Sequence, residues 1–285
     1  MNRRLRIAVV AGLVVLLVAA AVLAFGFWQF TRPVPESYSH TAEYRASVQP
    51  NATLTNVTLY LPLPVEAGSS PVGDALADDS PNVVDAPPDW SVEVAQTESG
   101  PMLAVSLPTL EPAYRERPPP RPIDPDAETA TPGAATATPD PQSTPIRTLD
   151  DYRVRVEMAF DEPIDTRSPV GSEPVLRPRF DATETECPFP APESTVCREF
   201  GTRMFLSYDA PADATVEVTV SYEARNEWFA GGWTGNSYRQ STRTVVTGDG
   251  PGWVAVRATE AVGEGTYRGA PAVAVSGAAA TVRPT

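Results

Sequence analysis

The chain contains 285 residues, with a formal net charge of −14 and a sequence pI near 4.5. This acidic balance argues against a nucleic-acid partner, because phosphate contacts require clustered cations. The 22 basic residues are all arginine, and 32 prolines with 18 glycines suit strands joined by turns better than a helical protein.

The first predicted element is an apolar run, residues 7–27, which follows the arginine-rich residues 1–6. At about 1.5 Å of rise per residue, a helix of this length crosses a hydrocarbon core of roughly 30 Å. We therefore predict a transmembrane helix, acting as a signal-anchor, over residues 7–28. Positive charge stays on the cytoplasmic side, so residues 1–6 are predicted inside and the bulk of the chain extracytoplasmic.

A cleaved signal peptide is the alternative interpretation of this run, since the small residues at 22–24 resemble a cleavage site. The apolar core of a signal peptide usually has about 7 to 15 residues, which favours the anchor. The aromatic residues within 25–30 fit the outer headgroup interface. The expected location is the cell membrane, crossed once.

The first strand is predicted over residues 38–48, where apolar and polar residues alternate with period two. His40, the only histidine, lies on the apolar side, where we expect a packed, hydrogen-bonded residue and no general base. Two sequons follow at Asn51 and Asn56. On the outer side of a membrane both are candidate N-glycosylation sites, although such triplets also arise by chance in threonine-rich sequence.

Weaker strand patterns cover residues 54–61, 90–97 and 103–107. The last two are predicted to form a hairpin that turns at residues 98–101. The stretch 65–89 is acidic and rich in turn formers, and we predict it to be irregular.

A proline- and threonine-rich tract occupies residues 108–149. It contains too few apolar residues to offset the entropy of ordering it, so we predict a disordered insertion. The tract either links two domains or is a long excursion from one. The part before it offers only about four short strands, which is marginal for a separate core. We therefore predict one extracytoplasmic domain over residues 36–285, interrupted by the tract.

Residues 152–160 alternate as a strand, and an irregular stretch over 161–202 then carries both cysteines. Cys187 and Cys197 are predicted to form a disulfide, because closing so short a loop outside the cell is worth roughly 3 kcal/mol. A zinc or redox site is the alternative interpretation. Zinc needs about four ligands, and the chain has neither a CxxC spacing nor a second ligand pair.

The clearest alternation of all covers residues 216–225, with weaker strand patterns at 204–208, 242–247 and 253–258 and a strand plus tail over 270–282. Beyond the apolar run, no window shows sustained helical spacing. The fold class expected is all-β: an antiparallel β-sandwich, Ig-like or related, with one N-terminal transmembrane helix.

The most aromatic segment after the membrane run, residues 228–238, is rich in turn formers and is predicted to be a loop at the end of the sandwich. Its rings can stack on sugar faces or form a protein-binding patch. The simpler, structural interpretation is favoured, in which Trp228 and Trp233 only cap the end of the sandwich. The candidate binding residues are Trp228, Phe229, Trp233, Asn236, Tyr238 and Arg239.

Motifs for catalysis are absent: the sequence has no GxSxG, HExxH, GxxxxGK[ST] or GxGxxG. None of its acidic runs has the order of an EF-hand loop. We therefore expect no enzymatic activity, no cofactor and no metal. A glycosidase that brings two carboxylates together by folding stays an alternative.

These observations lead to the expectation of a structural or protein-interaction role in the cell envelope. The expected partners are the membrane itself and an envelope protein or polysaccharide, with no nucleic acid. Two alternatives are a carbohydrate-binding or carbohydrate-cleaving ectodomain and an accessory subunit of a membrane complex.

Overall fold

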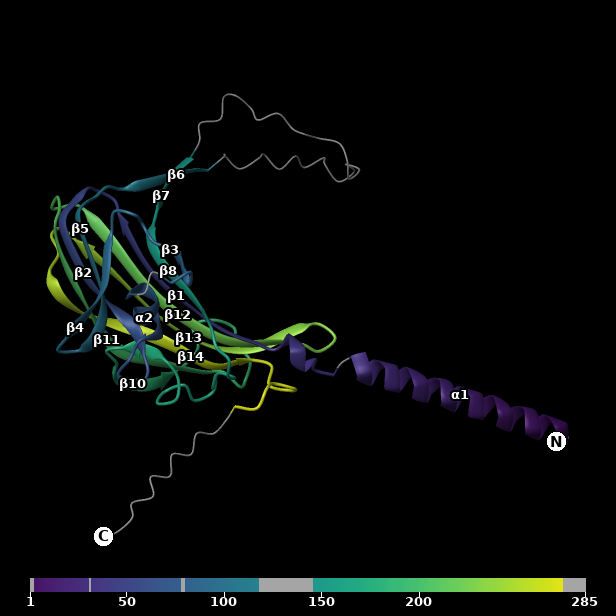
Figure 1. The fold of residues 1–285 in the computed structure, drawn as a ribbon. Helices are drawn as coiled ribbons and strands as arrows, with labels where there is room; N and C mark the ends of the chain where they lie inside the picture. Colours follow the sequence, from purple (N-terminus) through teal and green to yellow (C-terminus); the bar gives the residue numbers. More distant parts are fainter. Residues whose placement is uncertain (1–2, 31, 78–79, 118–145, 274–285) are drawn as a thin grey trace, which may run out of the picture.

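The structure, a computed structural model, consists of one protruding helix and a β-rich body (Figure 1). Helix α1 (Arg3–Phe30) is followed by a short 3-10 turn, η1 (Pro35–Ser37). Within the part of the chain that is described, α1 provides the one segment long and apolar enough to cross a membrane, with a mean hydropathy of 2.4 and no burial against the body. The apolar helix predicted near the N-terminus is confirmed. The described residues are 3–30, 32–77, 80–117 and 146–273.

All strand pairs in the body are antiparallel, and one hydrogen-bonded path runs β3-β8-β1-β12-β13-β14-β11-β2-β5-β4. Strand β9 adds to β2, β10 adds to β11, and β6 pairs with β7 in a separate ribbon. The strands are β1 (Ser39–Pro50), β2 (Leu54–Val65), β3 (Val83–Asp85), β4 (Ser91–Thr97), β5 (Gly100–Leu110), β6 (Ala113–Arg117), β7 (Ile146–Asp150), β8 (Tyr152–Ala159), β9 (Val175–Arg177), β10 (Phe180–Thr185), β11 (Val196–Asp209), β12 (Thr215–Phe229), β13 (Trp233–Thr247) and β14 (Gly252–Gly265).

The sheet curls around its own core, as the bend of the long strands in Figure 1 shows. Along β12, every second residue from Val216 to Trp228 is buried, while the residues between them face outward. The same alternation runs through β1, because side chains of successive strand residues point to opposite faces. The Tyr44 hydroxyl donates to the Pro62 carbonyl at 2.9 Å. This bond joins β1 to β2, which are not neighbours in the sheet, and so crosses the enclosed core.

A short helix, α2 (Pro71–Ala77), lies between the two ends of the curled sheet and contacts β4, β2 and β8. Its Val72 and Ala75 belong to the buried core. Beside it, the ring of Trp90 meets that of Tyr152 at 6.1 Å, which brings the start of β8 against the segment that leads into β4. The core is thus covered where the hydrogen-bonded path ends.

The all-β, antiparallel prediction is confirmed, but the division into the two stacked sheets of an Ig-like sandwich is not. Hydrogen bonding continues without a break from β3 to β4. The physical reason lies in the length of β12, β13 and β14, which have 14 or 15 residues each. Strands of that length twist enough for one sheet to fold over its own apolar face.

Several segments predicted to be irregular contain helices or strands in the structure. The stretch 65–89 contains α2 and β3, and 161–202 contains β9, β10 and the start of β11. Short apolar sets such as Val72 and Ala75 have too few residues to show helical spacing in the sequence. Of the tract 108–149, both ends form strands, and residues 118–145 lie outside the described residues. The strand expected over 270–282 is not formed in its described part, up to residue 273.

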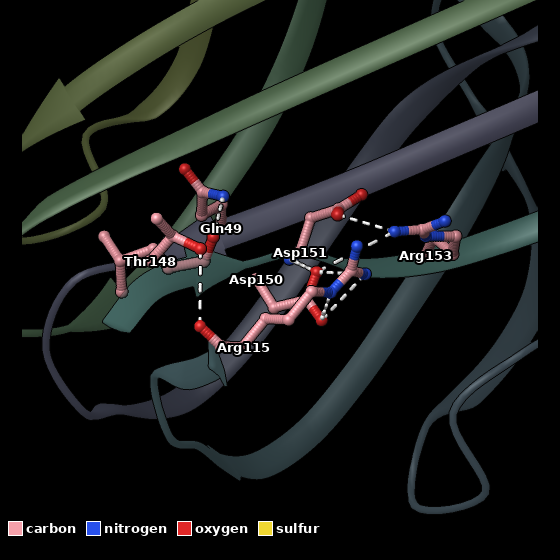
Figure 2. A network of polar contacts seen from close by, with 7 residues as sticks. Gln49, Arg115, Thr148, Asp150, Asp151 and Arg153 are labelled. Atoms are coloured by element: carbon pink, nitrogen blue, oxygen red, sulfur yellow. Dashed lines mark hydrogen bonds and ion pairs between the residues drawn. The ribbon is translucent and has the colours of Figure 1, made fainter. Parts of the chain in front are cut away.

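The ribbon of β6 and β7 is fastened to the body by a polar network, which Figure 2 shows from close by. Arg115 binds both carboxylate oxygens of Asp150, at 2.9 and 3.1 Å from one terminal nitrogen. Arg153 pairs with Asp151 at 2.7 Å, and Gln49 donates to the Leu149 carbonyl at 3.3 Å. Although solvent loss opposes ionisation, the Asp151 amide and the Arg115 guanidinium lower the pKa of Asp150. The two strands that flank residues 118–145 are therefore paired with each other and joined to β1 and β8.

Candidate functional site

An open groove of about 980 Å³ crosses the outer face of the sheet. The strand register explains its shape, because it places residues from six adjacent strands in one transverse row. The row runs from β8 through β1, β12, β13 and β14 to β11, and at about 4.8 Å between strands it spans roughly 24 Å. Its members in order are Arg155, Arg45, Ser221, Ser241, Thr259 and Glu199.

Three hydroxyl side chains form the middle of this row. Ser221 lies opposite Ser241, and Ser241 lies opposite Thr259. The hydroxyls of Ser241 and Thr259 are 3.0 Å apart, so one donates to the other. Small side chains at these outward positions leave the space above the sheet open, and each hydroxyl both donates and accepts hydrogen bonds. The floor of the groove can therefore bind polar atoms of either kind.

At one end of the groove, like charges stand directly opposite each other on β8 and β1. Arg155 faces Arg45, and Glu157 faces Glu43. The ion pairs consequently run along and diagonally between the strands: Arg45 to Glu43 at 2.6 Å, Arg155 to Glu43 at 2.8 Å, and Arg155 to Glu157. Partial burial opposes ionisation of Glu43, but the hydrogen bond from Arg155 and both guanidinium charges outweigh it and lower its pKa. At this end of the groove, the two arginines and the two glutamates therefore neutralise one another.

A second row of residues runs beside the first and ends at the disulfide. It passes from Glu157 and Glu43 to Glu223, then to Arg239. Arg239 pairs with Glu264 at 3.1 Å, whereas Glu223 forms no ion pair with a described residue. Burial and the nearby charge of Glu223 raise the pKa of Glu264, and Arg239 acts against them. An exposed carboxylate thus lies beside the hydroxyl floor.

The far wall of the groove is the segment 185–189, and the predicted disulfide holds it. Cys187 and Cys197 are joined with their Cα atoms 5.2 Å apart, so the pairing is confirmed. Thr185 lies opposite Cys197 in the ladder between β10 and β11. Beyond the disulfide, the ring of Phe189 packs on the guanidinium of Arg239 at 4.1 Å. The wall is therefore tied to the floor by a covalent bond and a cation–π contact.

A buried ion cluster supports the floor from the inner side. The carboxylate of Glu260 is fully buried and accepts hydrogen bonds from both terminal nitrogens of Arg179, at 3.1 and 2.9 Å. Arg198 and Gln240 also donate to it, at 3.3 and 2.6 Å. The Gln240 carbonyl oxygen accepts from the Leu176 amide at 2.6 Å. Strands β13 and β14 are thereby fixed to the segment that carries β9 and β10.

The segment predicted as an aromatic loop is a β-hairpin in the structure. Strand β12 continues to Phe229 and β13 begins at Trp233, so only a tight turn separates them. Trp228 and Tyr238 are fully buried, and Asn236 is buried as well. Alternation along the strands sends these side chains inward. The turn-forming glycines in the sequence suggested a loop, but they occupy the turn and the outward positions of the hairpin.

The three remaining candidates of that segment lie in two different places. Phe229 and Trp233 stand at the hairpin tip, where their rings meet at 6.0 Å. Trp233 is 71% exposed. Arg239 lies on the outer face, in the groove described above. The six predicted binding residues are therefore not brought together in one site.

The buried amides form a hydrogen-bonded network that includes the single histidine. His40 Nδ1 and Asn226 Oδ1 are 2.8 Å apart, and Asn226 donates to Asn236 at 2.8 Å. The Thr166 hydroxyl donates to Asn236 at 2.8 Å, and Asn226 also donates to the Ile164 carbonyl. His40 is a packed, hydrogen-bonded residue, as the sequence predicts. The network fastens the segment 164–166 to the inner side of the sheet.

The two sequon asparagines are exposed at the other end of the sheet. The Asn51 side chain accepts from the Thr215 amide at 2.7 Å. Asn56 adopts a positive φ of 54° and donates to the Asp209 carboxylate at 2.6 Å. Both side chains are accessible and both take part in local hydrogen bonds.

A second surface escaped the sequence analysis because it depends on strand register. Tyr60, Phe205 and Trp253 lie directly opposite one another on β2, β11 and β14. Their rings are 5.1 and 5.4 Å apart on the outer face, and Trp253 is 46% exposed. The guanidinium of Arg203 lies over Trp253 at 5.7 Å. Each of the three aromatic residues occupies an outward position in the alternating pattern of its own strand. This position is the one signal in the sequence that could have indicated an aromatic surface.

Comparison with known proteins supplies no template for these surfaces. No family model matches the chain, and no curated protein or solved structure is significantly similar to it. Among the described residues, no group of three or more histidine, cysteine, aspartate or glutamate side chains is arranged to hold a metal ion. The features of the described residues that bear on function are the groove, the aromatic row and the apolar helix.

Proposed function

We propose that the chain is a single-pass membrane protein of the cell envelope whose β-rich body binds an extended polypeptide segment of a partner in the transverse groove. The observation that carries this proposal is the continuous polar row across six strands. A span of roughly 24 Å accommodates about seven residues of extended chain. Hydroxyl groups at the centre and paired charges at the end suit a backbone that both donates and accepts hydrogen bonds.

The proposed role is binding without catalysis. The single histidine is committed to the buried amide network, and the charged groups of the groove are largely paired with one another. A rigid wall favours recognition, because a preorganised site loses little conformational entropy when it binds. The disulfide and the contact between Phe189 and Arg239 supply that rigidity.

Photo-crosslinking in intact cells tests the groove directly. A photoreactive amino acid at Ser241, in the floor, is expected to capture one polypeptide partner. The matched control is Val245, which is exposed on the same strand and outside the groove. Adding the substitution Ser221→Tyr is expected to block the floor and abolish capture. Equal capture from both positions, or capture of a glycan, contradicts the proposal.

The proposed topology places the N-terminus in the cytoplasm and the body outside. Its support is the arginine excess before the helix and the disulfide after it, since disulfides persist in oxidising compartments. Asp213 is exposed between β11 and β12, and both native cysteines are paired. An Asp213→Cys variant is therefore expected to react with a membrane-impermeant maleimide on intact cells. Labelling that requires cell lysis contradicts this orientation.

Carbohydrate binding is the second candidate, and the aromatic row favours it. Aromatic rings that are exposed on a sheet can stack on sugar faces, and Arg203 adds hydrogen-bond donors beside Trp253. A glycan array with the detergent-solubilised full chain distinguishes this function. Binding that is lost in Trp253→Ala and kept in Ser221→Tyr supports a sugar site on this row, whereas no binding above background excludes it for the glycans tested.

A further inference from the structure

The β12–β13 hairpin ends in an aromatic tip. Its exposure is unusual, because large aromatic side chains at a surface that faces water are normally more buried. Trp233 is 71% exposed, and Phe229 packs against it at 6.0 Å. Tryptophan is a large apolar side chain with one polar nitrogen, and its exposure at the end of a protruding hairpin leaves most of its surface unburied. The tip, residues 229–233, thus presents apolar surface outward.

The hairpin tip lies against the end of the apolar helix, as Figure 1 shows. The ring of Phe30, the last residue of α1, meets that of Phe229 edge-on at 6.5 Å. A Cβ atom at Gly231 would lie 3.1 Å from the same Phe30 ring, so the turn packs closely on the helix end. The exposed rings of Phe27 and Trp28 continue this surface along the last turn of α1.

Hydrogen bonds fix the tip relative to the chain that follows the helix. The Val34 amide donates to the Phe229 carbonyl at 3.0 Å, and the Phe229 amide donates to the Ser37 hydroxyl at 2.8 Å. On the other side, the Tyr38 hydroxyl donates to the Gly269 carbonyl at 3.2 Å. The hairpin tip and the segment 34–37 are therefore joined by hydrogen bonds in both directions.

The chemistry around the tip matches the headgroup region of a bilayer. Trp rings gather at membrane–water interfaces, and Phe belongs to the apolar face of segments that lie in the interface plane. Arginine there places its charge among the headgroups while its stem stays apolar. The guanidinium of Arg32 lies over the Trp28 ring at 4.6 Å, next to the helix end. Two segments far apart in the chain, α1 and the hairpin tip, thus contribute one continuous belt of this composition.

We infer that the hairpin tip inserts into the outer headgroup region of the same bilayer that α1 spans, with Trp233 as its principal anchor. This inference rests on the proposed membrane anchorage of α1. It adds a second attachment, so the body is held at a defined angle to the membrane. The orientation of the groove relative to the lipid surface is then set by two points separated in sequence by about 200 residues.

Spin labels on the full chain in phosphatidylcholine vesicles test this inference. Single cysteines are introduced at Gly232, where a Cβ meets no atom within 4 Å, at Val18 in α1, and at Asp213. Asp213 precedes the opposite end of β12, roughly 45 Å from the tip. The native cysteines are paired and stay unlabelled under oxidising conditions. Collision rates with oxygen and with a water-soluble nickel chelate report depth.

The label at Gly232 is expected to collide with the nickel chelate several-fold less often than the label at Asp213. Trp233→Ala is expected to raise that rate several-fold, whereas Trp253→Ala, which removes an exposed tryptophan elsewhere on the body, is expected to leave it unchanged. Equal nickel access at Gly232 and Asp213 overturns the inference, and so does a shielded Gly232 label that Trp233→Ala does not affect.

The label at Val18 separates this inference from the proposal beneath it. A Val18 label shielded from nickel together with an accessible Gly232 label leaves the anchor standing and removes the second attachment. An accessible Val18 label removes the membrane anchorage itself, and the inference with it.

Discussion

Two buried or half-buried carboxyl groups differ in the partners that the fold gives them. Glu260 is surrounded by donors from Arg179, Arg198 and Gln240. Glu173 lies near the carboxylates of Glu66 and Asp165. The neighbours of Glu260 are hydrogen-bond donors that include two guanidinium groups, whereas those of Glu173 include two further carboxylates. Substitution of each carboxyl by an amide should therefore have opposite effects on stability.

Glu260→Gln is expected to lower the free energy of unfolding by about 3–5 kcal/mol, because it leaves the buried Arg179 guanidinium without a counter-charge. Urea unfolding followed by circular dichroism measures the change. Glu264→Gln is the matched control on the same strand, since its ion pair with Arg239 is partly exposed and worth little. Equal losses for both variants would contradict the assignment of Glu260 as the supporting charge.

Glu173 is expected to make the protein less stable as the pH rises from 4.5 to about 7. Burial, followed by the charges of Glu66 and Asp165, raises its pKa to about 7 from 4.5, while the hydrogen bond from the Asp165 amide acts against them. A carboxyl with a raised pKa in the folded state stabilises the fold below its unfolded pKa, and this contribution is lost between about pH 4.5 and pH 7. Glu173→Gln should remove that dependence.

Urea midpoints at about pH 4 and about pH 8 check this expectation. The Gln variant is expected to match the parent protein near the lower pH and to exceed it near the higher pH. Glu98→Gln, at an exposed turn, serves as the control. A Glu173→Gln variant whose midpoint falls below that of the parent at the higher pH would contradict the sign of the effect.

At the scale of single residues, the sequence predicts contacts that depend on local chemistry. It identified the disulfide from spacing and the packed histidine from its place in an alternating strand. It could not identify the pair of Arg179 and Glu260, because 81 positions separate them in the chain. Trp228 and Tyr238, two of the candidate binding residues, are buried, as the structural interpretation expects for Trp228. Neighbouring glycines obscure a period-two pattern that continues into the turn.

At the scale of elements, the disulfide holds one wall of the groove. Replacing both cysteines with serine is expected to cost roughly 3 kcal/mol of stability in the chain-entropy model. The stronger consequence is local, because β10 is exposed throughout and the segment after it depends on the bond to Cys197. Hydrogen exchange in residues 183–190 should therefore rise far more than in the core strand β12.

Mass-spectrometric hydrogen exchange on the full chain measures both segments in one experiment. Single substitution of Cys187 provides a check, because it also breaks the bond while leaving one thiol. Unchanged exchange in residues 183–190 would show that the contact of Phe189 with Arg239 is sufficient to hold the wall.

The sequence predicted which strands exist better than it predicted where each strand begins and ends. The strands of the β1, β8 and β12 region were evident from alternation, but β11, β13 and β14 were recognised only as short pieces of strands with 14 or 15 residues. Polar inward residues, such as Gln240 and Thr242, interrupt their patterns. The groove itself was not predictable, because it depends on the register of six strands, which no single strand pattern specifies.

At the scale of the whole molecule, strands from both sides of residues 118–145 alternate in one sheet. Strand β1 lies between β8 and β12, and β2 lies between β5 and β11. A protease cut between residues 118 and 145 is therefore expected to leave the two fragments associated in mild detergent. Size-exclusion chromatography of the nicked protein, followed by denaturing electrophoresis of the peak, checks this.

Separation of the two fragments under native conditions would contradict the interleaved pairing. The control is the same nicked protein unfolded in urea, in which the two fragments must separate. The ribbon of β6 and β7 should survive the native cut, since Arg115 and Asp150, which come before and after the cleaved segment in the sequence, bind each other (Figure 2).

The interleaving of early and late strands also governs the order in which the molecule can fold. During synthesis β1 is the first strand to emerge, but it pairs with β12, which comes much later in the chain. His40 in β1, for example, bonds to Asn226 in β12, 186 positions further on. Until β12 is available, β1 and β2 present unpaired edges, which are templates for wrong association. Contacts so distant in sequence form slowly, because each requires the closure of a long loop. Nearly the whole chain must therefore be synthesised before the sheet can fold. Until then, the first half has to be kept from associating through its unpaired strand edges.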